Sequence, residues 1–93
     1  MNYSLILTPR AAKELDNLKK SGQKKLVSKV AGLMDELIID PRAGTGKPER
    51  LKHYSDGEMW SRRLDKKNRM VYEIRDSEII VLVLSVTGHY DDK

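Results

Sequence analysis

The sequence predicts an α+β fold, in which a mostly antiparallel, twisted sheet packs one of its faces on a helix hairpin. Two segments with apolar residues three or four positions apart, as on one face of a helix, occupy most of the first half of the chain. One short apolar segment precedes them, and four segments of strand-like composition, separated by turn residues, follow them. The predicted order is therefore β-α-α-β-β-β-β, within a single domain that spans residues 1–93.

The chain begins with a short predicted strand at residues 3–7 and continues into the first helix. Thr8 is suited to cap that helix, and Pro9 suits its first turn because the N–H group that proline lacks has no partner there. Apolar residues at three-residue spacing predict the buried stripe of this helix, namely Ala12, Leu15 and Leu18. Ser21 and Gly22 predict its end.

A second helix is predicted over residues 23–39. Its apolar side chains share one broad face, formed by Leu26, Val30, Leu33 and Leu37 and widened by Val27, Met34 and Ile38. Asp40 and Pro41 predict its end, because the residue before a proline is disfavoured in the helical conformation. The short break between the two helices predicts an αα-hairpin.

Residues 42–48 contain two glycines and a proline, which predicts a loop. Four strands are predicted after this loop, with a turn between each consecutive pair. The strands are expected at residues 49–54, 59–64, 69–75 and 78–86, and the turns at residues 55–57, 65–68 and 76–77. The last strand is the most apolar of the four, which predicts a central position in the sheet.

Side chains alternate between the two faces of a strand, so we expect one face on the helices and one open face. In the strand at residues 69–75, Met70, Tyr72 and Ile74 suit the core, and the alternate positions Arg69, Val71, Glu73 and Arg75 suit the open face. In the strand before it, Arg62 and Arg63 are neighbours. We expect one of them to point outward and the other to lay its aliphatic stem on the core. The pattern predicts a basic open face.

The composition indicates a polyanionic partner and excludes several kinds of site. The chain has 18 Lys and Arg against 14 Asp and Glu, a formal charge of +4, and nine of the 18 cations lie within residues 47–75. The absence of cysteine excludes disulfides, thiolate zinc sites and a cysteine nucleophile. The two histidines are 36 positions apart, which argues against a metal centre, and no cofactor is expected.

No membrane contact is expected. The longest apolar run, at residues 79–84, has six residues and is far shorter than a membrane span. The first residues lack a basic region followed by a long apolar one, so no signal peptide is visible. We therefore expect a cytoplasmic protein.

If the predicted strands pair as neighbours, one sheet face gathers an acid, an imidazole and several cations. The residues concerned are Glu49, Lys52, Arg63, Arg69, His89 and Tyr90. Such a set suits general acid–base cleavage of RNA, in which the 2′-hydroxyl is the nucleophile: glutamate takes up its proton, histidine protonates the departing 5′ oxygen, and cations stabilise the phosphorane. From the residues alone, nucleic-acid binding without catalysis is favoured over nuclease chemistry, and both remain open.

The order and spacing of several motifs add a family resemblance. The chain resembles the YoeB/Txe branch of the RelE/ParE toxin superfamily, whose members are the toxin halves of bacterial toxin–antitoxin pairs and share a compact RNase-like fold. The motifs that carry the resemblance are Gly46-Lys47-Pro48-Glu49-Arg50-Leu51-Lys52-His53, then Gly57, Trp60-Ser61-Arg62-Arg63, Asn68-Arg69-Met70-Val71-Tyr72 and His89-Tyr90.

The resemblance implies a ribosome-dependent mRNA endonuclease, which cuts the message in the ribosomal A site by metal-independent attack of the 2′-hydroxyl. By position, Glu49 corresponds to the general base, His89 to the general acid and Arg69 to the ligand of the transition-state phosphate. Tyr90 corresponds to a residue that helps to position the substrate or the acid.

Other positions of the same motifs correspond to contacts with the RNA. Arg63 and Lys52 are expected to hold the RNA backbone and orient the message. Lys47 and His53 are assigned supporting contacts, and for His53 the alternative is a strand histidine that orders the neighbouring loop. Trp60 belongs to the same motifs, and we expect it in the core with its N–H satisfied locally.

The resemblance also implies partners. These are a cognate antitoxin, with an acidic and partly disordered segment that folds on the toxin, and the ribosome with its message; a homodimer is also compatible with the family. Two alternatives stay open. One is a non-catalytic toxin of the ParE type, which inhibits DNA gyrase by binding, and the other is an RNA-binding module.

Overall fold

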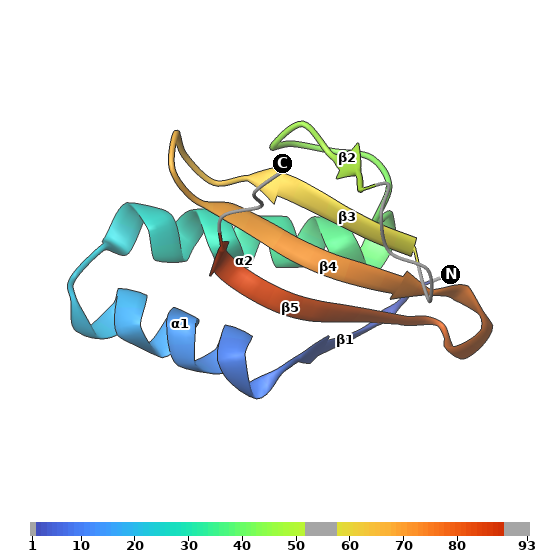
Figure 1. Cartoon of the computed structure of the whole chain (residues 1–93), viewed down its shortest axis with the longest axis horizontal. Helices are drawn as coiled ribbons and strands as arrows, with labels where there is room; N and C mark the ends of the chain where they lie inside the picture. Colours follow the sequence, from blue (N-terminus) through green and yellow to red (C-terminus); the bar gives the residue numbers. More distant parts are fainter. Residues whose placement is uncertain (1, 52–57, 89–93) are drawn as a thin grey trace.

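The computed structural model describes residues 2–51 and 58–88 and has two layers, a five-stranded sheet and two helices that cover one of its faces (Figure 1). The elements follow the predicted order. They are β1 (Ser4–Leu7), α1 (Pro9–Lys20), α2 (Lys24–Ile39), β2 (Glu49–Arg50), β3 (Glu58–Arg63), β4 (Arg69–Arg75), a 3-10 turn (Asp76–Glu78) and β5 (Ile80–Gly88). The strand order in the sheet is β1-β5-β4-β3-β2, with β1 parallel to β5 and the other pairs antiparallel. The predicted α+β class and the mostly antiparallel sheet are confirmed.

The helix hairpin begins at the predicted cap. The Thr8 hydroxyl accepts a hydrogen bond from the Ala11 N–H at 3.2 Å, and Pro9 is the first helical residue. The predicted buried stripe is wrong at one position, because Ala11 is fully buried and Ala12 is exposed. The spacing of positions 11, 15 and 18, one step of four residues and one of three, follows the helical period of about 3.6 residues more closely than the predicted two steps of three.

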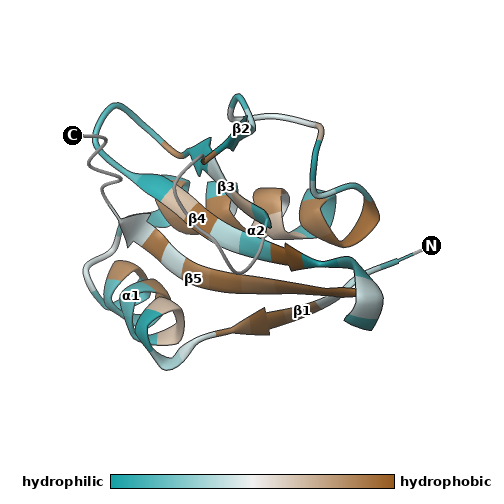
Figure 2. Ribbon diagram, turned by 45° about the vertical axis from the view of Figure 1, so that its right-hand side comes forward, coloured by the Kyte–Doolittle hydropathy of each residue, from teal (hydrophilic) through white to brown (hydrophobic). Residues whose placement is uncertain are grey.

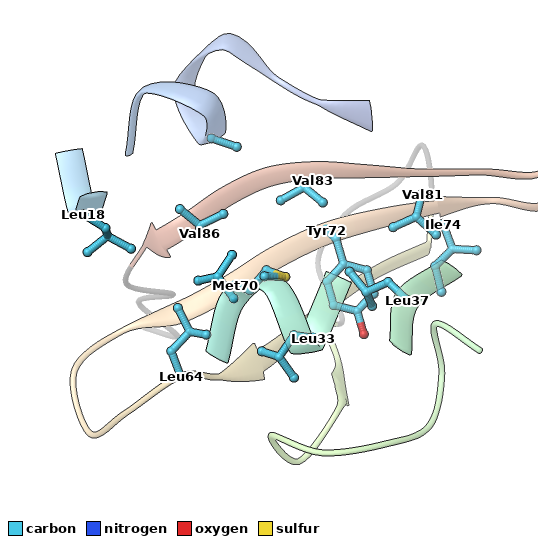
Figure 3. Close-up of a cluster of buried hydrophobic side chains, with 12 residues drawn as sticks. Leu18, Leu33, Leu37, Leu64, Met70, Tyr72, Ile74, Val81, Val83 and Val86 are labelled. Carbon is cyan, nitrogen blue, oxygen red and sulfur yellow. The ribbon is translucent and has the colours of Figure 1, made fainter. Parts of the chain in front are cut away.

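The second helix buries its predicted face, with Val30, Leu33 and Leu37 at 1% exposure or less. These side chains meet those from the helix-facing side of β4 and β5, including Tyr72, Val81 and Val83 (Figure 3). The resulting core is filled mainly by aliphatic side chains, as the absence of Phe requires. Both helices are thereby held on one face. The opposite face, called the open face here, carries no helix of the described part of the chain; Arg63 is exposed on it, whereas Met59 and Ser61 on the same side of β3 are buried, at 7% and 1% exposure.

The bounds of β2 and β5 differ most from the prediction, whereas β1 begins one residue later than predicted and β3 lies one residue earlier. The first strand after the loop has only the two residues of β2; Leu51 N–H extends the pairing by one bond to Met59 O at 2.8 Å, and residues 52–57 lie outside the described part of the chain. The last strand begins at Ile80 rather than at residue 78, because Asp76–Glu78 form a 3-10 turn that ends with Ile79 in a left-handed conformation (φ 55°). That strand extends to Gly88, two residues beyond the predicted end.

The predicted central position of the last strand is confirmed in the sense that β5 is an interior strand, paired with β1 on one side and β4 on the other. Figure 2 shows that β5 is largely hydrophobic along its length, whereas β2 is hydrophilic. The polar side of the molecule therefore lies towards the β2 edge of the sheet.

Among the described residues, no helix is long and apolar enough to cross a membrane.

Candidate functional site

The open face of the sheet brings one predicted acid next to one predicted cation. Glu49 on β2 is opposite Ser61 on β3, and Arg69 on β4 is opposite Arg63 on the same strand. Opposed residues project to the same face, and here that is the face away from the helices, because the alternate positions Met70 and Tyr72 are buried in the core. The Glu49 Oε1 and Arg69 Nη1 atoms are 3.4 Å apart across β3.

This pair is accessible to a ligand. The Glu49 side chain is 64% exposed and that of Arg69 is 30% exposed. An exposed carboxylate can accept a proton from a bound substrate, and the fork of a guanidinium matches the oxygens of a phosphate. The pair therefore has the geometry for proton transfer and phosphate binding at the same place.

Arg63 adds a second guanidinium to this face. It is exposed and stands directly opposite Arg69 in the β3–β4 register. Like charges in opposed positions of a sheet destabilise it. In the part of the chain that the structure describes, no salt bridge involves Arg63. Two opposed arginines beside a single carboxylate make this end of the sheet suited to a polyanion.

The loop before β2 is fixed against β3 at its last residues. Arg63 N–H donates to Gly46 O at 2.7 Å, and a Cβ on Gly46 would lie 2.9 Å from Arg63 O. Gly46 has a φ of +82°, so both its conformation and its close approach require glycine. Lys47 follows with a φ of +50°, which is uncommon for a residue with a side chain. The loop thus places the backbone of Lys47 beside the arginine pair, two residues before Glu49.

The end of β5 lies on the other side of Arg69, because Arg69 is opposite Gly88. The Glu14 carboxylate on α1 holds this end: its Oε1 accepts from the Ser85 hydroxyl and the Val86 N–H, each at 2.8 Å, and from the Thr87 N–H at 3.3 Å. Burial acts to raise the pKa of Glu14, but the hydrogen bonds from Arg10, Ser85 and the two N–H groups outweigh it and hold this pKa below its usual value. A carboxylate from the first helix therefore fixes the last residues before position 89.

Four predicted site residues lie outside the described residues, namely Lys52, His53, His89 and Tyr90. The described ones divide by face. Glu49, Arg63 and Arg69 gather on the open face, and Lys47 lies in the adjoining loop. Trp60 belongs to the helix-facing side, where it packs on the core, and its Nε1–H donates to Glu58 Oε2 at 2.7 Å as predicted.

The sequence prediction missed the role of Arg62. Its side chain is wholly buried, with an exposure of 0%, rather than reaching the surface with its charged end. The guanidinium is instead neutralised by Glu36 on α2, with Nη1 and Oε1 2.6 Å apart. The signal that could have found it is its alternation with Trp60 and Leu64, both of which face the core.

Glu36 is also a partner of the loop before β2. It accepts from the Thr45 N–H and from the Thr45 hydroxyl, each at 2.8 Å. The pKa of Glu36 is held below its usual value, mainly by the bond from the Thr45 hydroxyl and then by the bond from the Thr45 N–H. The charge of Arg62 lowers this pKa further. Glu36 is therefore the anion that joins the buried arginine to the loop.

A second polar network fixes the start of the same loop. Arg42 donates to both carboxylate oxygens of Glu58, at 2.7 and 2.9 Å, and to Asp76 at 2.7 Å. The hydrogen bonds with Arg42, together with the bond from Trp60, outweigh burial, which acts to raise the pKa of Glu58, and hold this pKa below its usual value. The loop is thus anchored at both ends, and its position relative to the sheet is defined.

Within residues 2–51 and 58–88, no group of three His, Cys, Asp or Glu side chains could hold a metal ion.

Comparison with known proteins agrees with this fold. A family model described as YoeB-like toxin of bacterial type II toxin–antitoxin system matches residues 9–90. The protein named Toxin YoeB from Synechocystis sp. is 38% identical over 71 residues, which cover 76% of this chain and 79% of that protein.

Two solved structures from Staphylococcus aureus have the same architecture. The YoeB dimer is 27% identical and superimposes with a TM-score of 0.82, over 97% of this chain and 100% of that one. The heterotetrameric complex of the YoeB–YefM toxin–antitoxin is 27% identical and gives a TM-score of 0.78 over the same shares of the two chains.

Proposed function

The chain belongs to the YoeB-like toxin family of bacterial type II toxin–antitoxin systems, and from this premise we propose that it is a ribosome-dependent mRNA endoribonuclease. The observation that carries the proposal is the 3.4 Å approach of Glu49 Oε1 to Arg69 Nη1 on an open, basic sheet face. Inhibition of a partner by binding alone, as in a gyrase inhibitor, does not need a carboxylate paired with a phosphate ligand.

The proposed reaction uses the nucleophile of the RNA itself. Glu49 takes the proton from the 2′-hydroxyl, whose oxygen attacks the adjacent phosphorus. Arg69 binds the non-bridging oxygens, on which negative charge builds up in the transition state. His89 gives a proton to the departing 5′ oxygen, so the products are a 2′,3′-cyclic phosphate and a 5′-hydroxyl end. Tyr90 is proposed to position the substrate or the acid, and no step requires a metal ion.

The cations around this pair are proposed to hold the message. Arg63 is the register partner of Arg69, and its exposed guanidinium can bind a neighbouring phosphate. Lys47 adds a charge from the loop, and Lys52 and His53 are proposed to act in the same way. A small domain buries little RNA, so the ribosome supplies the remaining binding energy and holds the message in a reactive geometry.

The proposed partners follow from the same family. A Staphylococcus aureus relative forms a heterotetramer with its antitoxin YefM, and another structure of that relative is a dimer. We expect an antitoxin with an acidic segment to cover the basic open face of this chain, and homodimers to form in its absence. Action on ribosomes places the protein in the cytoplasm.

The test compares two glutamates on the same sheet face. Purified protein is mixed with ribosomes carrying a message in the A site, and the cut message is mapped by primer extension. Glu49→Gln is expected to lower the cleavage rate at least 100-fold, whereas Glu73→Gln is expected to leave it within twofold. Glu73 is a matched control because it is paired with Arg75 at 3.2 Å, near the opposite end of β4.

Two results would overturn the proposal. One is equal cleavage by the wild-type protein and Glu49→Gln, which would remove the assigned base. The other is equal cleavage of the same RNA with and without ribosomes, which would remove the dependence on the A site.

A further inference from the structure

Arg62 is a cation with every donor in use and no contact with solvent. Its Nε–H donates to the Tyr72 hydroxyl at 3.0 Å, and its Nη1 group to Glu36 at 2.6 Å and to Thr45 O at 3.4 Å. Its Nη2 group donates to Asp40 O at 3.2 Å and to Ala43 O at 2.8 Å. A guanidinium has five N–H donors, so this set of partners is complete.

Most of these partners belong to the loop at residues 40–46, which has no helix or strand of its own. Three of its carbonyls accept directly from Arg62. A fourth, Pro41 O, accepts at 2.7 Å from the Tyr72 hydroxyl, which in turn accepts from Arg62. Tyr72 projects from β4 towards α2, so the network reaches the loop from inside the core (Figure 3). The guanidinium is therefore the common hydrogen-bond donor that holds three carbonyls of the loop.

The same loop leads to Glu49. It ends at Gly46, whose carbonyl accepts from Arg63 N–H, and Lys47, Pro48 and Glu49 follow. Arg62 and Arg63 are adjacent on β3 and project to opposite faces. The first holds the loop from the helix side, and the second lies on the open face beside Arg69. A shift of the loop would move Glu49 relative to Arg69, since only two residues separate Gly46 from Glu49.

Burial of a guanidinium is a costly way to stabilise a fold, because apolar side chains of similar volume would often do so equally well. The arrangement instead defines one conformation for an irregular loop. We propose that Arg62, with Glu36 as its counter-ion, is a positioning residue that fixes the 40–46 loop and thereby sets Glu49 against Arg69. This inference rests on the proposed role of Glu49 as the base.

The principal test uses Glu36→Gln, which keeps the shape of the side chain but removes the counter-ion of Arg62 and one carboxylate acceptor of Thr45. Arg62→Met is the second variant. Val30→Ala is the control, because Val30 is fully buried on the same helix and is not part of the network. The fluorescence of Trp60, the single tryptophan, confirms that each variant is folded at the assay temperature.

Rates on message-bearing ribosomes are measured with Glu49 present and in a Glu49→Ala background, with long incubations for the latter. With Glu49 present, Glu36→Gln is expected to lower kcat about tenfold and to leave KM within twofold, since the RNA-binding cations remain. In the Glu49→Ala background the same change is expected to have less than a twofold effect, because there is no base left to position.

A merely structural role predicts a different pattern. The loss in kcat would then be the same in both backgrounds, and Val30→Ala would reproduce it; either result would overturn the inference while the proposed reaction stands. Full activity of Glu49→Ala would overturn both. Amide exchange at Arg63, whose N–H binds Gly46 O, gives a readout independent of activity. We expect faster exchange in Glu36→Gln and in any folded Arg62→Met, and unchanged exchange in both would count against a role of Arg62 in fixing the loop.

Discussion

Glu49 and Arg69 lie on strands that are not paired with each other, yet their side chains meet on the open face of the sheet, with Oε1 and Nη1 3.4 Å apart. The strand between them contributes Ser61 opposite the acid and Arg63 opposite the arginine. Sheet register, rather than proximity in the chain, thus brings a proton acceptor and a phosphate ligand together.

For Arg69→Ala we expect a loss of rate with little loss of stability. The ion pair with Glu49 is largely exposed, and such pairs contribute about 0–1 kcal/mol to the free energy of unfolding. Removal of a donor to the developing phosphorane charge should instead cost roughly 100- to 1,000-fold in kcat. Thermal unfolding and cleavage of A-site message measure the two effects. A fall in unfolding free energy of several kcal/mol, with the rate retained, would make Arg69 a structural residue.

For Lys47→Gly we expect weaker binding of ribosome-bound message without a loss of stability. The φ of +50° is strained for lysine by about 1 kcal/mol and is freely available to glycine, although glycine also adds entropy to the unfolded chain. Lys47→Ala is the matched control, since it removes the same charge and keeps the strain. Both variants should raise KM alike and reduce its dependence on salt, and only the glycine variant should regain stability. Unchanged KM in both would remove Lys47 from the RNA site.

The hydroxyl of Tyr72 is expected to matter for stability. It is fully buried, donates to Pro41 O and accepts from Arg62, so Tyr72→Phe leaves two polar groups without a partner. The cost should be about 1–3 kcal/mol in urea unfolding. Tyr3→Phe is the comparison, because its hydroxyl is bonded to exposed Asp76, and there the cost should be below about 1 kcal/mol. Equal costs would show that the buried network does not hold the loop.

The Glu14 carboxylate predicts a pH dependence of stability. Its pKa is lowered in the folded protein, so its contribution is fully present above the pKa of the unfolded chain and is lost as the pH falls through the folded value. Relative to Glu14→Gln, the wild-type protein should be more stable at pH 7, and the difference should shrink as the pH falls from about 5 towards 3. Melting temperatures of the two proteins across this range provide the measurement. A difference that is constant with pH would contradict the role of the charge.

Most of the fold could be predicted from local signals. Thr8 and Pro9 mark the start of the first helix, and the alternation at residues 69–75 assigns the core and open faces of β4 correctly. The stripe of the first helix is wrong at one position, because Ala11 and Ala12 are equally apolar and only the packing of the helix selects between them.

The candidate site was less predictable than the fold. The convergence of Glu49, Arg63 and Arg69 follows from strand pairing, which the alternation of side chains supports. Alternation also places Arg62 on the core side of β3, but it does not reveal the partners that make full burial of a charge possible, because these are mainly backbone carbonyls of a loop. Such carbonyls are present at every position of a sequence and give no signal. The same holds for Glu14, three of whose bonds reach residues more than 70 positions away.

The most direct test of the proposed chemistry is to remove the nucleophile from the substrate. A message with a single 2′-deoxynucleotide at the mapped cleavage position is placed in the ribosomal A site and compared with the all-ribose message. We predict no cleavage at that position, and a 2′,3′-cyclic phosphate at the cut end of the all-ribose message. Cleavage of both messages at the same rate would contradict attack by the 2′-hydroxyl, and with it the assignment of Glu49 as the base.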